Sequence, residues 1–490
     1  MSRELTVIVL AAGGGTRMKS KTMKVLHPIC GRSMIGHVLT AVAGSGADRV
    51  VTVVGHQREV VGPHVRALMP EAVLAVQEEQ AGTGHAVRVA VEALIAAEGN
   101  VEGTVLVAYG DTPLLEGESL RALAAEHEAA QRAVSILSAV VPAPFGYGRV
   151  VRDEEGEVVA IVEEKDATPQ QREIAEINSG ILAFDAEFLL SALPRISNDN
   201  AKGEYYLTDT VNIAREDGLA VGALVIDDVV QTEGANDRVQ LADLGREMNR
   251  RILTRWMREG VTVMDPATTW VDADVVLARD VTLLPGTQLL GATSVAEDAV
   301  VGPDTTLKDC EVGEGAKVVR THGELAVVGA GANVGPFSYL RPGTQLGDAG
   351  KIGAFVETKN AEIGAGAKVP HLSYIGDAEI GEGTNIGAGT IVANYDGVAK
   401  HRTKVGRHAR TGSNNTFVAP VEIGDGAATG AGTVVRRDVP PGALAVSAGE
   451  QRSIEGWVER RRPGTAQAEA ARAAREAADP GDQDSQPSPE

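Results

Sequence analysis

The stretch "EIGAGAKVPHLSYIGDAEIG", residues 362–381, carries the pattern that decides the fold of the second half of the chain. Its apolar residues Ile363, Val369 and Ile375 are six residues apart, and a glycine follows the first and the last of them. A period of six fits neither an α-helix, with about 3.6 residues per turn, nor a strand that alternates in twos. It is typical of a parallel β-helix, in which each hexapeptide forms one short side of a coil.

The same six-residue step recurs in two further runs. Chance could produce one such run but hardly three, so this half of the chain is predicted to be a parallel β-helix. Three sides of six residues give a coil of about 18 residues. The further runs are Val328, Val334, Leu340, Leu346 and Ile352, and then Val405, Thr411, Phe417, Ile423, Thr429 and Val435.

The coil length predicts which side chains share a face of the β-helix. Residues one coil apart lie about 4.8 Å from each other on neighbouring coils. Arg341 and Lys359 are 18 residues apart and are predicted to form a basic column that suits a sugar phosphate. Tyr395, Ser413 and Ala431 have the same spacing and are predicted to form a small, polar column that suits a flat ligand.

The first half of the chain has a different texture. Short apolar runs typical of buried strands alternate with helix-like stretches, which predicts βαβ units and a mostly parallel sheet. In such sheets ligands bind at the carboxyl ends of the strands. The apolar runs include 5–10, 49–55, 105–111 and 134–141, and the helix-like stretches include 84–98 and 117–132.

An amphipathic helix is predicted between the two halves, because apolar residues recur there every three or four positions. The residues after Arg462 include no large apolar side chain and are predicted to be disordered, with transient helix in the Ala/Glu/Arg stretch as the alternative. The recurring apolar residues are Leu241, Leu244, Met248, Ile252 and Trp256. The predicted parts are an α/β domain over 1–238, a linker helix over 239–259, a β-helix domain over 260–462 and a tail over 463–490.

Composition and charge exclude several classes of function. With 67 acidic and 46 basic residues the net charge is -21, which argues against a general nucleic-acid binder and against binding to anionic membranes. No apolar run approaches the ~18 residues that span a bilayer, and the first residues do not resemble a signal peptide. The two cysteines, Cys30 and Cys310, make neither a disulfide framework nor a zinc pattern. We expect a cytoplasmic protein without nucleic-acid or membrane partners.

A glycine-rich segment, "LAAGGGTRM", follows the first predicted strand at residues 10–18. Glycines let backbone amides approach phosphate oxygens, and Arg17 and Lys24 add positive charge nearby. This pattern predicts a site for a nucleoside triphosphate, although a tight strand-to-helix turn is the alternative. Asp111, in "YGDTPLL", also follows a strand-like run and is a candidate ligand of Mg²⁺, with a helix N-cap as its alternative role.

The order of these and other motifs resembles the sugar nucleotidyltransferases. The string "QEEQAGTGHA", residues 77–86, is similar more narrowly to the bacterial bifunctional N-acetylglucosamine-1-phosphate uridyltransferase/glucosamine-1-phosphate N-acetyltransferase family. The resemblance covers nearly the whole chain apart from the tail. The other motifs that carry it are "LAAGGGTRM…KVLHPICGRSM", "YGDTPL", "GYGRVV" (146–151), "IVEEKDA" (161–167), "INSGI" (177–181) and "TEGANDR" (232–238).

For the first half, the resemblance implies a Rossmann-like nucleotidyltransferase domain that moves the uridylyl group of UTP onto N-acetylglucosamine-1-phosphate and releases pyrophosphate. Mg²⁺ is the implied cofactor, bound by Asp111 and Asn236. Arg17 and Lys24 are the implied catalytic residues beside the triphosphate. The implied uridine contacts are Leu10, Ala11, Ala12, Gly13, Gln77, Gly82 and Thr83, and the implied sugar contacts are Tyr109, Gly148, Glu163 and Asn178.

For the second half, the resemblance implies a left-handed β-helix that acetylates glucosamine-1-phosphate with acetyl-CoA. His371 is the implied general base, since an imidazole can take the proton of an amine that attacks a thioester. A homotrimer with shared acetyl-transfer sites is also implied. The implied phosphate contacts are Arg341, Lys359, Tyr374 and Lys400, Asn385 is implied on the sugar, and the implied acetyl-CoA contacts are Ala388, Asn394, Tyr395, Ser413 and Ala431.

One position departs from the family pattern. Some members have an arginine near the coenzyme phosphates where this chain has Ala448, and Arg452 is an alternative contact.

Two other functions are compatible with the same domains. One is a single-activity nucleotidyltransferase whose β-helix only oligomerises or senses effectors, and the other is a regulatory subunit without chemistry. His371 and the "NYDG" motif at 394–397 argue against the first. The cations and metal-ligand candidates of the first domain argue against the second. The favoured product is UDP-N-acetylglucosamine, a precursor of bacterial cell-wall polymers.

Overall fold

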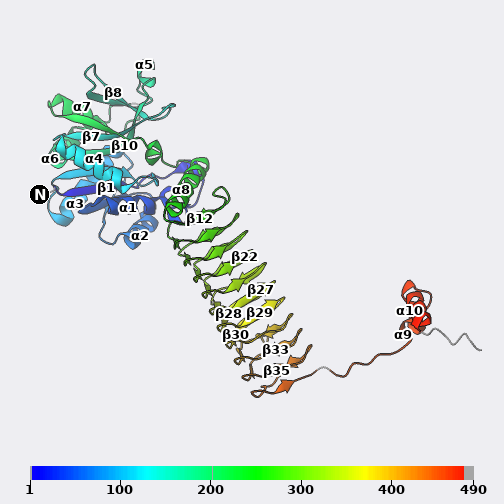
Figure 1. Ribbon diagram of the computed structural model, residues 1–490. Helices are drawn as coiled ribbons and strands as arrows, with labels where there is room; N and C mark the ends of the chain where they lie inside the picture. Colours follow the sequence, from blue (N-terminus) through cyan, green and yellow to red (C-terminus); the bar gives the residue numbers. More distant parts are fainter. Residues whose placement is uncertain (1–2, 201, 448, 479–490) are drawn as a thin grey trace, which may run out of the picture.

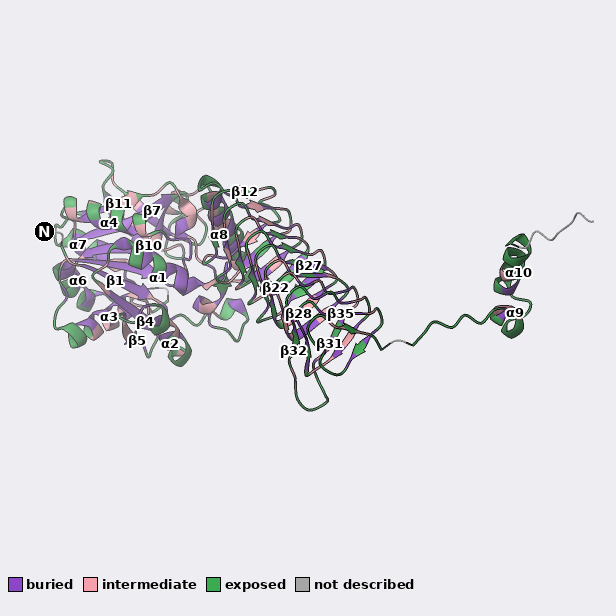
Figure 2. Ribbon diagram, turned by 60° about the horizontal axis from the view of Figure 1, so that its bottom comes forward, coloured by how far each residue is buried: buried purple, intermediate pink, exposed green. Residues whose placement is uncertain are grey.

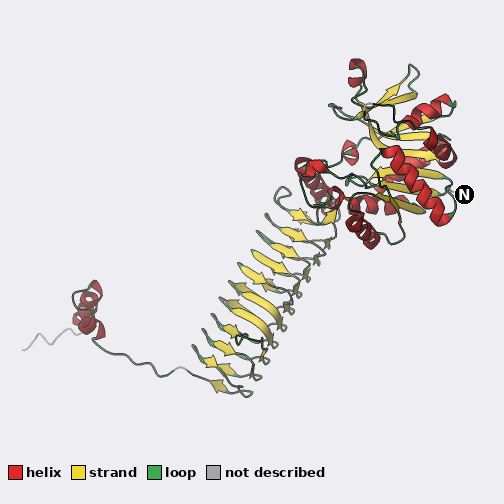
Figure 3. Cartoon of the chain, turned by 180° about the vertical axis from the view of Figure 1, so that it is seen from behind, coloured by secondary structure: helices red, strands yellow, loops and turns green. Residues whose placement is uncertain are grey.

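The computed structural model of the chain describes residues 3–200, 202–447 and 449–478. An α/β domain lies at one end, a long rod of stacked strands follows it, and two short helices lie beyond the rod (Figure 1). Helices are concentrated in the α/β domain, whereas the rod consists of strands and turns (Figure 3). This order confirms the predicted α/β domain, linker helix and parallel β-helix.

The α/β domain is built on a nine-stranded mixed sheet. Its central strand β1 (Leu5–Leu10) runs parallel to β4 (Arg49–Val54) and β6 (Thr104–Tyr109). These strands are continuous apolar runs because helices cover both faces of the sheet. The strand β10 (Glu176–Asp185) is antiparallel to its neighbours β6 and β7. Seven of the strands follow the order β11-β7-β10-β6-β1-β4-β5, where β5 is Val73–Val76, β7 is Val134–Val140 and β11 is Val221–Val225. The other two lie off this order: β8 (Gly148–Arg152) pairs with β10 and with β9 (Val158–Val162).

Helices pack on the two faces of this sheet and form two separate apolar clusters. Figure 2 shows the buried central strands between helices whose outer sides are exposed. One cluster includes side chains of α3 (Thr83–Glu98), α6 (Ala186–Ala192) and α7 (Asp209–Glu216). The other includes side chains of α1 (Met34–Ser45), α2 (Arg58–Leu68) and α4 (Gly117–Ala129). The loops between these elements and the strands are therefore held on a rigid base.

The linker helix α8 (Arg238–Arg258) begins one residue before the predicted start. Its N-cap is Asp237, whose carboxylate accepts hydrogen bonds from the backbone N–H of Val239 and Gln240, as expected for an aspartate in this position. Its buried face belongs to the same apolar cluster as the interior of the rod. The Asn249 amide fixes this contact by donating to the Thr269 carbonyl at 2.8 Å. Within the described residues, no helix is long and apolar enough to cross a membrane.

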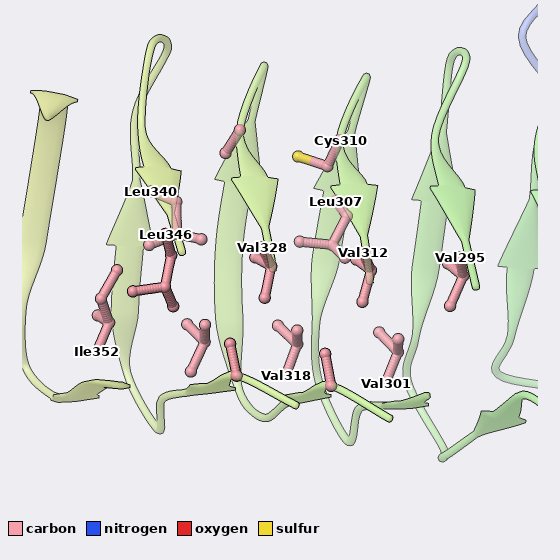
Figure 4. Close-up of a cluster of buried hydrophobic side chains, with 14 of the residues drawn as sticks. Val295, Val301, Leu307, Cys310, Val312, Val318, Val328, Leu340, Leu346 and Ile352 are labelled. Carbon is pink, nitrogen blue, oxygen red and sulfur yellow. The ribbon is translucent and has the colours of Figure 1, made fainter. Parts of the chain in front are cut away.

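The rod is a parallel β-helix that extends from β12 (Thr262–Val263) to β37 (Leu444–Ala445). In the first coils, residues 18 apart pair as predicted, for example Trp270 with Gln288. Some later coils are shorter, and Val301 pairs with Val318, 17 residues on. Inward-facing apolar side chains stack in columns along the rod (Figure 4). Burial of these columns is the main favourable contribution that the coils share.

The predicted disordered tail differs from the structure over part of its length. Residues Ala466–Ala478 form helix α10, which packs on the short helix α9 (Trp457–Arg461). The alanine-rich sequence has a high helix propensity, and Ala468 is buried against α9. Residues 479–490 of the predicted tail lie outside the described residues.

Candidate active sites

The predicted uridine contacts meet in one pocket at the carboxyl ends of β1 and β6. Because Leu10 pairs with Tyr109 across these parallel strands, the loops that follow both strands open on the same edge of the sheet. The pocket is lined by Leu10, Ala11, Ala12, Gly13, Lys24, Val25, Gln77, Gln80, Gly82, Thr83, Ala86, Tyr109, Asp111 and Glu204.

A backbone clamp shapes the far wall of this pocket. The N–H of Tyr205 donates to the Ala81 carbonyl at 2.8 Å, and the N–H of Gly84 donates to the Tyr205 carbonyl at 2.8 Å. The Thr83 hydroxyl accepts a hydrogen bond from the N–H of Leu207 at 3.0 Å. Gly82 lies in this clamp with a φ of 106°, and a Cβ there would lie 2.6 Å from the Tyr205 carbonyl oxygen. The clamp therefore requires glycine at position 82.

The side chain of Gln77 is held in one orientation beside the clamp. It is buried, and its Nε2 donates to the Gly82 carbonyl at 3.2 Å. This bond uses the donor side of the amide, so that the Gln77 oxygen is the group that can accept a hydrogen bond from a ligand. The neighbouring Gln80 donates to the Ala12 carbonyl at 2.6 Å and ties the two walls together.

The two predicted catalytic cations, Lys24 and Arg17, have different surroundings. The Lys24 ammonium contacts the Asp111 carboxylate and lies 2.8 Å from the Asn236 side-chain oxygen. A Cβ on Gly15 would lie 2.5 Å from the Lys24 Cβ, so glycine at this position allows the lysine to lie against the loop. Arg17 lies on the short helix η1 (Thr16–Met18) and is exposed. Arg17 is not among the residues that line this pocket in the described part of the chain.

Asp111 and Asn236 fit a small, hard cation such as Mg²⁺. Their side-chain oxygens converge on a single positive group, the Lys24 ammonium. Both are oxygen donors of the kind that Mg²⁺ prefers. Among the described residues there is no group of three or more His, Cys, Asp or Glu side chains that could hold a metal by itself. A Mg²⁺ ion at this position would therefore take further oxygens from phosphates of the substrate.

The predicted sugar contacts come together on three neighbouring strands. On β8 (Gly148–Arg152), Gly148 pairs with Asn178 of β10. A Cβ on Gly148 would lie 3.5 Å from the Glu163 Oε1, which places Glu163 beside them after β9 (Val158–Val162). Burial raises the pKa of the Glu163 carboxyl above its ordinary value, against the opposing effect of Lys202. Tyr109 lies half-buried next to this group, and burial raises the pKa of its hydroxyl.

On the β-helix, the predicted basic column is confirmed. Leu340 pairs with Thr358, so Arg341 and Lys359 follow each other on adjacent coils. The Lys359 ammonium lowers the pKa of Lys400, which joins the same group of cations. The hydroxyl of Tyr374, at the start of β30 (Tyr374–Ile380), lies 3.4 Å from Nδ2 of Asn394.

The predicted column of Tyr395, Ser413 and Ala431 is wrong at Tyr395. Ile391 pairs with Thr416, 25 residues on, because this coil contains extra residues. Residues 394–402 leave the coil as a hairpin, in which Tyr395 and Lys400 form an antiparallel bridge.

Ala388 occupies the position on the coil next to Ser413 that the spacing predicts for Tyr395. The N–H of Asn414 donates to the Ala388 carbonyl, and the N–H of Gly432 donates to the Ser413 carbonyl. Ala388, Ser413 and Ala431 therefore occupy matching positions on consecutive coils.

His371 and Asn385 lie on a different side of the β-helix from the basic column. His371 ends β29 (Lys368–His371), where it pairs with Ala354 of β27 (Lys351–Ala354), and it is exposed. Asn385 pairs with Lys368 on the same sheet. Arg341, Lys359 and Tyr374 belong to the other sheet of the coil. A single chain thus brings His371 to the corner beside Tyr374 but leaves Asn385 on the side of Lys368.

Two carboxylates of this region are missing from the sequence-based prediction. Glu357 accepts a hydrogen bond from Arg341 at 2.8 Å. Asp377 accepts hydrogen bonds from Asn360 and Asn394 and lies 3.7 Å from the Lys359 ammonium. Burial opposes ionisation of Asp377, but the two amides and Lys359 outweigh it and hold its pKa below the ordinary value.

Both carboxylates lie on the coils that carry the predicted cations. This location is the one signal from which the sequence could have predicted them. In the first domain, Glu204 lines the pocket that the uridine candidates share, and no motif of the sequence points to it. The position of Ala448, where the family pattern has a coenzyme contact, lies outside the described residues.

Comparisons with known proteins agree with this arrangement. Residues 7–167 match the model of the MobA-like NTP transferase domain. The chain is 60% identical over 481 residues to the bifunctional protein GlmU of Rhodococcus jostii (strain RHA1), covering 97% of this chain and 96% of that protein. It is also 60% identical over 481 residues to the bifunctional protein GlmU of Rhodococcus opacus (strain B4), with the same coverage. The identity to the bifunctional protein GlmU of Paenarthrobacter aurescens (strain TC1) is 59% over 472 residues, covering 96% of this chain and 95% of that protein.

Proposed function

The chain belongs to the GlmU family of bifunctional proteins, and we propose that its α/β domain transfers uridylyl groups while its β-helix transfers acetyl groups. It is a bifunctional acetyltransferase and uridylyltransferase of UDP-N-acetylglucosamine synthesis, a source of cell-wall precursors. The assignment of one reaction to each domain rests on one observation. The uridine candidates line one pocket of the α/β domain together with Tyr109 and Asp111, whereas the cations of the second site lie on the coils.

In the first reaction, a phosphate oxygen of N-acetylglucosamine-1-phosphate attacks the α-phosphorus of UTP, and pyrophosphate leaves. Gln77 and the backbone of residues 10–13 orient the nucleotide, and Gly148, Glu163 and Asn178 orient the sugar. Such positioning supplies much of the rate of phosphoryl-type transfers. Asp111 and Asn236 would hold Mg²⁺, which would supply positive charge opposite the phosphate oxygens. Lys24 adds a positive charge at the same point. Arg17 is exposed in the described chain and would act on the triphosphate from the loop.

In the second reaction, the amine of glucosamine-1-phosphate attacks the thioester carbon of acetyl-CoA, and the thiol of CoA leaves. His371 takes the proton of the amine as general base. Arg341, Lys359 and Lys400 hold the sugar phosphate with Tyr374. Asn385, which lies on a different side of the single chain, holds the sugar from a second chain of the trimer proposed below. Acetyl-CoA lies along Ala388, Ser413 and Ala431, with Asn394 and Tyr395 on the hairpin beside it. Support for this path comes from the matching positions of the three small residues on consecutive coils.

We also propose that the protein forms a homotrimer of left-handed β-helices in the cytoplasm. An exposed apolar column supports association. Phe337, Phe355 and Leu372 are 53%, 58% and 63% exposed on consecutive coils. The two phenylalanine rings stack at 5.2 Å between centroids. This column adjoins His371, so a second copy of the chain that covered it would reach the acetyl-transfer site.

The wild-type protein tests both reactions in separate assays. Pyrophosphate release is expected to require UTP, N-acetylglucosamine-1-phosphate and Mg²⁺ together. Thiol release from acetyl-CoA is expected to require glucosamine-1-phosphate and to proceed without UTP. Absence of thiol release from the folded protein would leave the β-helix as a structural stalk, and absence of pyrophosphate release would refute the first site.

A further inference from the structure

Arg149 is the bulkiest of the fully buried side chains in the described chain, with its side chain only 2% exposed. Its guanidinium reaches three different segments of the α/β domain. It donates to the Tyr147 carbonyl before β8 and to the Arg172 carbonyl at the end of α5 (Pro169–Arg172), 3.3 Å away. It also forms an ion pair with the Glu164 carboxylate at 2.7 Å.

A buried charge of this kind is costly unless its partners are held in place. The free-energy cost of moving a guanidinium out of water is offset only by good geometry with an opposite charge and by further hydrogen bonds. Arg149 has an opposite charge and two carbonyl acceptors, while its Nε and the Glu164 Oε2 have no hydrogen-bond partner among the described residues. The other ion pair of the same strand, Arg152 with Glu176, leaves 32% of the arginine side chain exposed. Of the two arginines of β8, only Arg149 is therefore a buried charge that needs fixed partners.

Each member of the buried pair is the chain neighbour of a proposed sugar contact. Arg149 follows Gly148 on β8, and Glu164 follows Glu163. Successive side chains of a strand point to opposite faces, so Arg149 lies behind the face on which Gly148 borders the sugar site. Across the site, Gly148 pairs with Asn178 and its α-carbon lies beside the Glu163 carboxylate.

We propose that Arg149 and Glu164 are positioning residues that set the distance between Gly148 and Glu163 and thereby the affinity for the sugar phosphate. This inference rests on the proposed uridylyl transfer in the α/β domain. The guanidinium links the two backbone segments that carry these sugar contacts. Lysine keeps the charge but cannot present the planar set of donors that reaches three partners at once. A displacement of about 1 Å between binding groups can cost up to ~100-fold in rate.

The test uses the Arg149→Lys variant of the full chain, with Arg152→Lys as the matched control from the same strand. Glu164→Gln is a second variant that leaves the arginine in place and decides the matter where Arg149→Lys does not fold. The KM for N-acetylglucosamine-1-phosphate and the KM for UTP are measured separately in the pyrophosphate assay. Acetyl transfer by the same sample reports whether the rest of the chain is intact.

We expect Arg149→Lys and Glu164→Gln to raise the KM for the sugar phosphate by about tenfold or more. The KM for UTP, the acetyl transfer and the control variant should stay at wild-type values. An unchanged KM for the sugar phosphate would overturn the positioning role. An equal rise of both KM values, or a loss of acetyl transfer in both variants, would also overturn it by revealing a general structural role. If the wild type itself gave no saturable use of the sugar phosphate, the proposed function would fail first.

Discussion

At the scale of single residues, the proposed nucleotide pocket depends on how closely two backbone segments approach each other. Gly82 and Gly84 lie against the carbonyl of Tyr205, and the Tyr205 N–H bonds the Ala81 carbonyl. Gly13 and Gly14, in contrast, have no other atom within 4 Å of an added Cβ. The glycines of the pocket thus serve two purposes, since some permit close packing and others keep space open for a ligand.

Replacement of Gly82 by alanine is expected to impair uridylyl transfer specifically. The φ of 106° and the contact of 2.6 Å with a backbone oxygen leave no room for a Cβ. Residues in such strained backbone states cost about 1–3 kcal/mol, so we expect the pyrophosphate-releasing activity to fall by about tenfold or more. Acetyl transfer should not change. The control is Gly44→Ala, in helix α1, where the new Cβ would lie 3.8 Å from Gly117 and should be tolerated.

Some site residues could be predicted from the sequence and others could not, for a physical reason. Asp111 and Lys24 each belong to a motif of neighbouring residues that the sequence shows directly. The structure brings the two side chains into contact. Arg149 and Asp377 have partners that become neighbours only when strands pair. Nothing in the residues next to them reveals a buried ion pair or a shared carboxylate.

At the scale of structural elements, the hairpin 394–402 distinguishes one coil from the regular β-helix. A tight turn holds it together, in which the Asp396 carboxylate accepts from the N–H groups of Val398 and Ala399 at 2.8 and 2.7 Å. The same carboxylate pairs with His401 at 2.7 Å. Because Lys400 lies on this hairpin, its position next to Lys359 depends on the turn.

Replacement of Asp396 by alanine is expected to weaken the binding of glucosamine-1-phosphate. Loss of the turn frees Lys400, and we expect the KM for this substrate to rise by roughly tenfold while the uridylyl transfer stays unchanged. The matched control is Asp265→Ala, which removes a similar turn aspartate at the first coil, where Asp265 accepts from the Ala267 N–H at 3.1 Å. A wild-type KM in the Asp396 variant would refute the role of the hairpin.

The period of six predicts the elements of the rod but not its irregularities. Inward-facing apolar residues fix where each strand lies, because a shifted register would expose them. The hairpin adds no residues to these apolar columns. The spacing from Tyr395 to Ser413 therefore predicts a regular coil, whereas the structure has extra residues there. For α10 the sequence predicts no more than transient helix, because its small side chains bury little surface.

At the scale of the whole molecule, the two proposed sites belong to parts that share one core. The apolar cluster that fills the rod continues through Leu244, Ile252 and Trp256 of α8 to Met34 of the α/β domain. The Arg32 guanidinium pairs with Asp274 across this junction. The sites themselves draw on different elements, so we expect single substitutions in one site to leave the other reaction intact.

The exposed apolar column predicts that association and acetyl transfer are linked. Replacement of both Phe337 and Phe355, which are exposed, by serine is expected to convert the proposed trimer into monomers. Acetyl transfer is expected to fall strongly as well, because we propose that a second chain completes the site. Light scattering and the thiol assay measure the two effects. Phe145→Ser, at a site 85% exposed on the α/β domain, is the control and should remain trimeric. A trimer that persisted in the double variant would refute the column as the interface.

The most direct test of the account is to measure both reactions in two variants, His371→Ala and Asp111→Ala. His371→Ala should lose thiol release from acetyl-CoA and retain pyrophosphate release, while Asp111→Ala should show the reverse. Circular dichroism confirms that each variant is folded. A folded variant that lost both reactions together, or a His371→Ala protein with full thiol release, would contradict the assignment of one reaction to each domain.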